Sequence, residues 1–205
     1  MSTTYPKQIF QQTDKSTLFT LIEQYPLATV LLPTSGESLS YKSFPHISHL
    51  PFYVDKEKNQ LIGHVSNHHP LAQILNSIAE EENSTSTHEK TAMIKLIFNG
   101  DNHYISPYCA SNHVVPTWNY SAVHLQGKAK VITLENEKTS TMAKITEHFE
   151  QKQNSPWQLS NLNTMQIKNM LKAISVFTID IEQMVGTFKL SQHKYNDVKT
   201  GSKGT

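Results

Sequence analysis

The chain of 205 residues contains no arginine, and all 18 residues counted as Lys or Arg are lysines. This absence excludes an arginine finger, a bidentate clamp on carboxylate or phosphate, and an Arg fork on guanine. Any anion that the protein binds must therefore be held by lysine, histidine, hydroxyl, amide or backbone N–H groups.

Cysteine, net charge and long apolar runs are also scarce. The single cysteine, Cys109, excludes an intrachain disulfide and a zinc site of several cysteines, and we interpret it as structural. A formal net charge of +1 creates no strong field for nucleic acid or an anionic membrane. Apolar runs such as 27–32 are too short to span a bilayer, and the N-terminus lacks the pattern of a secretory signal. We therefore expect a cytoplasmic protein without membrane contact.

The periodicity of apolar residues predicts a β-rich α+β fold in one domain, a small β-barrel with flanking helices. Asp14 is expected to cap the first helix, which Pro26 ends. Strands are predicted at 28–32, 44–54, 60–66, 92–98, 104–106, 122–134 and 175–182, and further helices at 70–78, 136–151 and 167–174. We expect a polar turn at 55–59, an exposed insertion at 80–91, an irregular loop at 107–121, a domain spanning 1–193, and a disordered polar tail at 194–205.

Four segments combine hydrogen-bond donors, aromatic rings and prolines at predicted loops and strand ends, where binding residues gather. They are Ser48–Phe52, Gly63–Pro70, the pair Tyr104–Pro107 and Val115–His124, and Gly186–Gln192. Such groups suit a planar, anionic, aromatic ligand. Residues 66–70 enter a helix, whose free N–H groups and dipole favour an anion.

In this order, the segments resemble the FMN-binding negative transcriptional regulators of the PaiB type, which have a split-barrel flavin-binding fold. The likeness covers residues 1–193 and rests chiefly on the sequences SHLP, GHV, YISP, VPTWNY and KLSQ. It implies an FMN-binding split β-barrel with flanking helices and a homodimer with FMN at the subunit interface. It also implies a set of cofactor-binding residues: Ser48, His49, Leu50, Pro51, His64, Val65, Ser66, His69, Ser106, Thr117, Trp118, Asn119, Lys189, Ser191 and Gln192.

The sequence departs from the family pattern where the family has an arginine before the helix. Asn67 occupies that position here, and His193 replaces the final Asn of the last motif. The cation that we expect to replace the arginine is Lys189, assisted by hydroxyl groups near Ser66 and Ser106.

Several side chains have a second interpretation. His64, Ser66 and His68 alternate and could face a metal or haem, but no Cys or carboxylate lies at ligand spacing, so no metal site is predicted. Trp118 and Tyr120 could be core aromatics, and His124 could face solvent or a second subunit. No nucleophile–base pair is recognisable, so no catalytic residue is predicted.

Three functions remain open from the sequence. The resemblance implies a flavin-binding regulator of transcription. A flavin-dependent oxidoreductase is the second hypothesis, since a cofactor can carry the chemistry. An interaction module that lost flavin is the third. We expect no sequence-specific DNA binding by this chain alone, because it has a net charge near zero and no arginine.

Overall fold

The computed structural model describes residues 6–32, 46–82, 92–107 and 115–192. In those ranges an eight-stranded antiparallel sheet has the order β3-β2-β6-β7-β8-β5-β4, and β1 pairs with the end of β8. The elements are η1 (Gln8–Phe10), β1 (Gln11–Gln12), α1 (Lys15–Gln24), β2 (Leu27–Leu32), β3 (His46–Pro51), β4 (Tyr53–Asp55), β5 (Gln60–Ser66), α2 (Pro70–Glu82), β6 (Ala92–Ile105), β7 (Thr117–Val131), α3 (Glu135–Glu150), η3 (Leu159–Asn161), α4 (Thr164–Lys172) and β8 (Ile174–Lys189).

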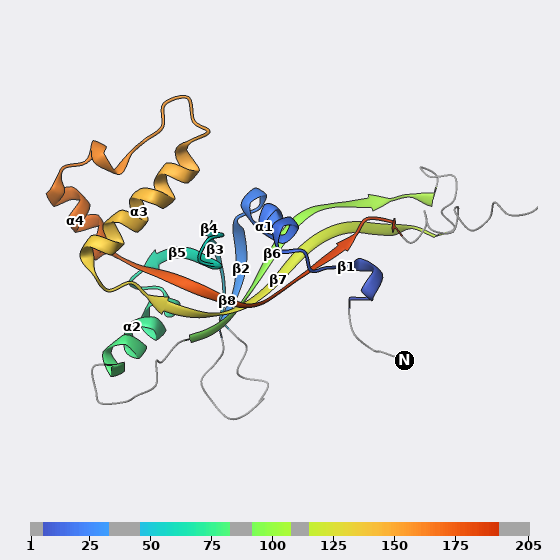
Figure 1. The fold of residues 1–205 in the computed structure, drawn as a ribbon, viewed down its shortest axis with the longest axis horizontal. Helices are drawn as coiled ribbons and strands as arrows, with labels where there is room; N and C mark the ends of the chain where they lie inside the picture. The colour runs from blue at the N-terminus through green and yellow to red at the C-terminus, as the bar shows by residue number, and fades with distance from the viewer. Residues whose placement is uncertain (1–5, 33–45, 83–91, 108–114, 193–205) are drawn as a thin grey trace, which may run out of the picture.

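Three strands of the sheet are much longer than the others. The far ends of β6, β7 and β8 run out beyond the rest of the molecule, away from α2, α3 and α4 (Figure 1). We call this extension, residues 99–107, 115–122 and 186–192, the arm. The arm and the helices α3 and α4 therefore lie at opposite ends of the same strands.

The core lies where α1 and α2 cover the inner face of the sheet. Phe52 packs edge-on against Phe98 and against Phe177, with ring centroids 6.1 Å apart in both pairs. Helix α1 adds Leu18, Ile22 and two neighbours, and α2 adds Leu71, Ala72 and Leu75. The predicted alternation along β7 is confirmed, with Val123, Leu125, Gly127 and Ala129 buried.

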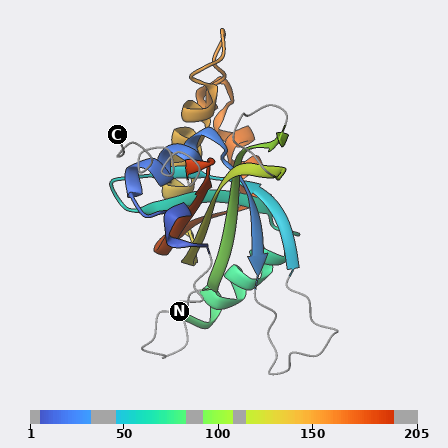
Figure 2. The ribbon, with the colours of Figure 1, turned by 90° about the vertical axis from the view of Figure 1, so that its right-hand side faces the viewer.

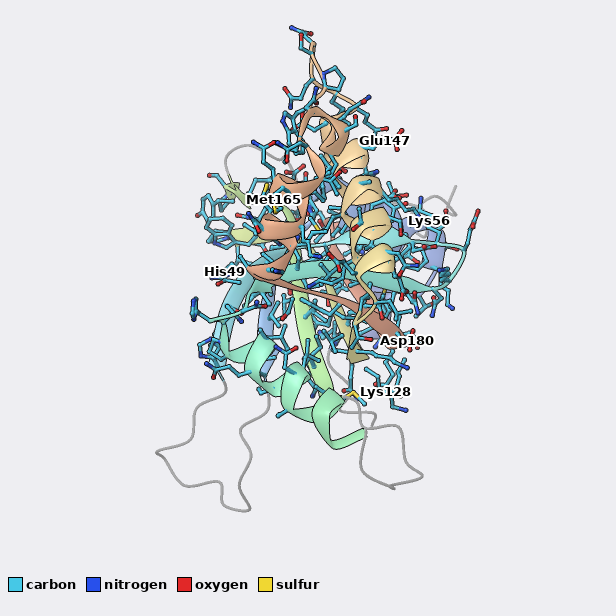
Figure 3. The ribbon with its side chains drawn as sticks, turned by 90° about the vertical axis from the view of Figure 1, so that its left-hand side faces the viewer. His49, Lys56, Lys128, Glu147, Met165 and Asp180 are labelled. Atoms are coloured by element: carbon cyan, nitrogen blue, oxygen red, sulfur yellow. The ribbon has the colours of Figure 1, made fainter. Side chains whose placement is uncertain are left out.

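Helices α3 and α4 lie together at the end of the sheet opposite the arm, in front in Figure 3 and behind in Figure 2, and α4 packs against β8. Val176 and Phe177 on β8 point to opposite faces and are both fully buried. A strand covered on both faces loses its alternation of polar and apolar residues, and 174–179 accordingly form a nearly continuous apolar run.

Several local predictions are confirmed. The Asp14 side chain accepts a hydrogen bond of 2.8 Å from the backbone N–H of Thr17 and caps α1. A polar turn joins β4 to β5, and Asn59 in this turn has a φ of 53°, a left-handed conformation that asparagine tolerates. Within the described ranges, no helix has both the length and the apolar character needed to cross a membrane.

Other boundaries were wrong. Helix α2 continues to Glu82, so residues 80–82 are helical rather than loop; residues 83–91 and the tail lie outside the described residues. Residues 117–121 belong to β7, β6 continues through 99–101 with a register shift, and β8 extends to Lys189. Cross-strand pairing holds these segments extended, although the Asn-Gly-Asp sequence at 99–101 favours a turn and Pro116 directly precedes 117–121.

Candidate functional site

The predicted cofactor residues fall into two groups at opposite ends of the sheet. The first, which we call the barrel-end cluster, lies on β3, on β5 and at the start of α2: Ser48, His49, Leu50, Pro51, His64, Val65, Ser66 and His69. The second, which we call the arm cluster, lies on the arm: Ser106, Thr117, Trp118, Asn119, Lys189, Ser191 and Gln192.

Strand β3 contributes an orphan hydroxyl to the barrel-end cluster. Ser48 lies opposite the fully buried Val30 in the register with β2, and its Oγ is buried with no hydrogen-bond partner among the described residues. A buried hydroxyl without a partner is costly and points to a group that the chain alone does not supply.

His49 points to the other face of β3. Its Nδ1 lies 3.3 Å from Oγ1 of Thr29, its cross-strand partner on β2. Sequence reasoning missed Thr29 as a neighbour of the cluster because only the register reveals which residues face each other.

The turn between β5 and α2 is closed by its own hydrogen bonds. Ser66 Oγ accepts from the backbone N–H of His68 at 3.3 Å, and Ser66 O accepts from that of His69 at 2.9 Å. His69 Nδ1 accepts from the N–H of Leu71 at 3.1 Å and so caps α2. These bonds use N–H groups that the sequence analysis expected to be free for an anion.

Histidines at this end of the sheet are partly shielded from water. Burial lowers the pKa of His69, and the adjacent His46 lowers this pKa further; the two rings pack edge-on with centroids 5.7 Å apart. Burial also lowers the pKa of His64. Both changes favour neutral imidazoles at pH 7. His46, like Thr29, was missed because its approach to His69 is a tertiary contact.

Neighbouring residues of β5 point to opposite faces. Val65 belongs to the hydrophobic core, whereas His64 shares its face with its cross-strand neighbour Val176. The side chains of His64 and Val65 therefore do not line one pocket.

In the arm cluster, polar residues from β7 and β8 are hydrogen-bonded in pairs. Lys189 Nζ donates to Oγ1 of Thr117 at 2.8 Å, and Ser191 Oγ donates to Oδ1 of the buried Asn119 at 2.8 Å. Ser191 is itself buried and has a φ of 64°, an unusual conformation for a serine. Gln192 Nε2 donates to the carbonyls of Phe188 and Ile9, which anchors the end of the motif.

Two aromatic rings lie exposed on the arm. Trp118 is 54% exposed and its cross-strand neighbour Tyr104 is 52% exposed, with ring centroids 5.8 Å apart in an edge-on arrangement. Trp118 is therefore not a core residue, and the pair offers an uncovered aromatic surface.

Within one chain, the two clusters are far apart. Ser48 aligns through β2 and β6 with Leu125 on β7, eight positions from Thr117, which corresponds to roughly 25 Å along the strand. Ser66 pairs with Ile174 at the opposite end of β8 from Lys189, about 50 Å along the strand. One copy of the chain therefore does not bring the predicted site residues together.

The outer face of the sheet, between the clusters, forms a groove of about 540 Å³. Apolar side chains of Leu31, Ile97 and Val185 line it together with polar ones, among them His124, Lys95 and Gln126. The same face continues onto Leu27 and Ile47, which are 60% and 55% exposed. Such an uncovered apolar sheet face is typical of a protein interface.

These observations are compatible with FMN, which needs hydrogen bonds to a ring edge, cover for a ring face, and groups that hold a phosphate. The Ser48 hydroxyl is available for a ring edge, and the exposed Trp118 ring for a ring face. The Lys189–Thr117 pair is available for the phosphate. Among the described residues, no three His, Cys, Asp or Glu side chains are grouped so as to hold a metal ion.

The fold is that of the FMN-binding split-barrel class, a β-rich α+β architecture of one antiparallel sheet with helices. Residues 4–183 match the model of a family described as "Putative FMN-binding domain", and the chain belongs to this family.

Two curated relatives cover most of the chain. "Protease synthase and sporulation protein PAI 2" of Bacillus subtilis is 26% identical over 93% of this chain and 83% of its own length. An uncharacterized protein of Emericella nidulans is 28% identical over 92% of this chain and 84% of its own. The predicted resemblance to the PaiB type is thereby confirmed at the level of the family.

Among solved structures, the FAD and heme binding protein from Mycobacterium smegmatis has a similar fold. It is 18% identical, covers 95% of this chain and 81% of its own, and has a TM-score of 0.63. At this identity the likeness shows the fold alone.

Proposed function

We propose that this protein is a homodimer that binds FMN between its two subunits, with each site built from the barrel-end cluster of one copy and the arm cluster of the other. The observation that carries this proposal is the separation of the clusters along the same strands. A two-fold dimer is self-complementary, so when each arm crosses to the other copy, two equivalent sites are completed.

The outer-face groove supports the same arrangement. Its apolar lining, with Leu27 and Ile47 beside it, is uncovered in the single chain and would be buried against a second copy. His124 would then face the second subunit rather than solvent, the two positions that the sequence left open.

The chain's own residues would share the work of holding FMN. Ser48 would donate its unpaired hydroxyl to the ring edge, and Trp118 would cover an aromatic face. Lys189 and Thr117 would hold the phosphate together with Ser66 and Ser106. Bound FMN would supply redox chemistry; the protein groups would orient it and keep water from it.

We further propose that the dimer acts in regulation of transcription, as a PaiB-type regulator. This proposal rests on the motif likeness to the PaiB type and on the named Bacillus subtilis relative, "Protease synthase and sporulation protein PAI 2". With a net charge of +1 and no arginine, the chain would act through a partner or a ligand rather than through direct operator recognition.

The test is an absorption spectrum after incubation with FMN and desalting, combined with mass measurement by light scattering. We expect retained flavin absorbance near one FMN per chain and a mass of two chains. Purified protein that retains no flavin, and whose melting temperature is unchanged by micromolar FMN, would contradict the proposal.

Stopped-flow reduction of the bound flavin distinguishes the regulator from the oxidoreductase. If the protein is a regulator, it has no need to bind a nicotinamide beside the flavin, so we expect slow reduction by NADH and NADPH. Rapid, saturable reduction would instead favour the oxidoreductase. A gel-shift titration that shows tight, sequence-dependent DNA binding at physiological salt would contradict the indirect mode of regulation.

A further inference from the structure

The backbone carbonyls at the end of α4 are held by two residues from other elements. Lys138 Nζ on α3 donates to Leu171 O at 2.9 Å and to Ile174 O at 3.0 Å. The Asn67 side chain donates to Lys172 O at 2.6 Å, and its backbone N–H donates to Ala173 O at 3.0 Å. Four successive carbonyls are thereby satisfied from the end of α4 to the start of β8, and those of the helix end lack intrahelical partners.

Both polar atoms of the Asn67 side-chain amide form hydrogen bonds. Its Oδ1 accepts a hydrogen bond of 2.8 Å from Ser175 Oγ, and that hydroxyl accepts from Asn76 Nδ2 at 3.4 Å. Ser175 is only 4% exposed, so the contact lies in the interior, where breaking a hydrogen bond is costly. Asn67 thus joins the turn between β5 and α2 to the junction of α4 and β8.

The anchored turn carries part of the barrel-end cluster. Ser66 directly precedes Asn67, and His69 follows it by two positions. Hydrogen bonds of Ser66 close this turn, and the His69 side chain caps α2. A residue whose side-chain amide and backbone N–H are used elsewhere is poorly placed to bind a ligand, but it fixes the geometry of its neighbours.

We propose that Asn67 is a positioning residue of the flavin site, which holds the turn at 66–69 in place through α4, with Lys138 completing the anchorage from α3. This inference rests on the proposed FMN binding. The family has an arginine at this position. In this chain Asn67 would anchor the turn instead of contacting the phosphate. The helices α3 and α4 then form part of the scaffold of the site.

Substitution by arginine separates the two roles, because they predict effects of opposite sign. If Asn67 positions the turn, Asn67→Arg breaks the network and we expect FMN to bind at least tenfold more weakly in a fluorescence titration. If position 67 faces the phosphate, the added cation tightens binding. Unchanged or tighter binding by Asn67→Arg would overturn the inference.

His68→Arg is the matched control. His68 is the exposed neighbour of Asn67, so this variant adds the same charge without touching the network. We expect its FMN affinity to stay within about threefold of wild type; a tenfold loss in this control as well would show that an arginine in the turn weakens binding without breaking the network, and would overturn the inference.

Hydrogen exchange on the FMN-free protein gives an independent readout. In Asn67→Ala and in the milder Ser175→Ala, we expect the amides of His68, His69 and Leu71 to exchange at least tenfold faster, with amides of β6 and β7 unchanged. If the amides of the turn exchanged at the same rate in the variants as in wild type, Asn67 would not be what orders the turn. Wild-type protein that takes up no FMN would refute the proposed function, while this comparison would still decide whether Asn67 orders the turn.

Discussion

Asp55 is a buried carboxylate, and a lysine from a distant helix compensates its charge. Its side chain is 6% exposed; Lys144 Nζ on α3 lies 3.1 Å from Oδ2, and the backbone N–H of Lys58 donates to Oδ1 at 3.2 Å. Burial alone would raise the pKa of Asp55, but the hydrogen bonds from Lys144 and Lys58 outweigh it and leave the pKa below its usual value.

The lowered pKa predicts acid sensitivity. A carboxyl group whose pKa is lower in the folded state stabilises the fold above the unfolded-state pKa, about 3.9, and this contribution is lost as pH falls through the folded-state value. We therefore expect the free energy of unfolding to decrease on acidification below about pH 4, less steeply in Asp55→Asn, as measured by urea titration. If the free energy of unfolding fell equally steeply with pH in wild type and in Asp55→Asn, this assignment would be contradicted.

Removing only Lys144 leaves the buried carboxylate without its cation. Because half of the Lys144 side chain remains in water, Lys144→Met should cost about 1–2 kcal/mol, less than for a fully buried pair. Lys56→Met is the control: Lys56 is equally exposed but pairs with Glu23 on the surface, 2.9 Å away, so its loss should cost under about 0.5 kcal/mol.

At the scale of single elements, the register shift in β7 requires a glycine. A Cβ at Gly127 would come closer than 3.0 Å to the backbone oxygen of Asp180 and to Ile179, and neither can move away easily. The need for glycine at position 127 comes from the approach of β8 rather than from its own strand.

Gly127→Ala should therefore destabilise the fold by about 1–3 kcal/mol, through displacement of β8. Gly100→Ala is the matched control, because its closest contact would be the Ser121 hydroxyl, which can rotate away. We expect a clearly smaller loss in chemical denaturation of Gly100→Ala. Equal losses in both variants would contradict the importance of the Asp180 backbone.

At the scale of the whole molecule, a shared site predicts complementation between defective chains. Ser66→Glu damages the barrel-end cluster, and Lys189→Glu damages the arm cluster; each places a negative charge near the expected phosphate. We expect either variant alone to lose FMN. Co-expressed chains form mixed dimers with one intact site each, so about a quarter of the sites should recover.

The recovered flavin should be found in mixed dimers isolated through two different tags. A mixture of separately purified, non-exchanging homodimers is the control and should hold none. Flavin retained by neither sample would show that each site lies within a single chain.

Much of the architecture was predictable from the sequence because it depends on local rules. The cap at Asp14, the alternation along β7 and the polar turn at 55–59 follow from side-chain chemistry and periodicity. The family, and with it the split-barrel class, was recognisable from short motifs. The absence of arginine is likewise a fact of composition, and by itself it excludes a guanidinium clamp.

Only the tertiary structure decided where those motifs lie. The ends of β6, β7 and β8 are extended because strands pair over long range, although residues 99–101, Asn-Gly-Asp, have the composition of a turn. The separation of the barrel-end and arm clusters, the orphan Ser48 hydroxyl and the anchorage of Asn67 all depend on register and on contacts between distant elements. Periodicity specifies which face a residue occupies, but the residue opposite is set by the packing of the whole chain.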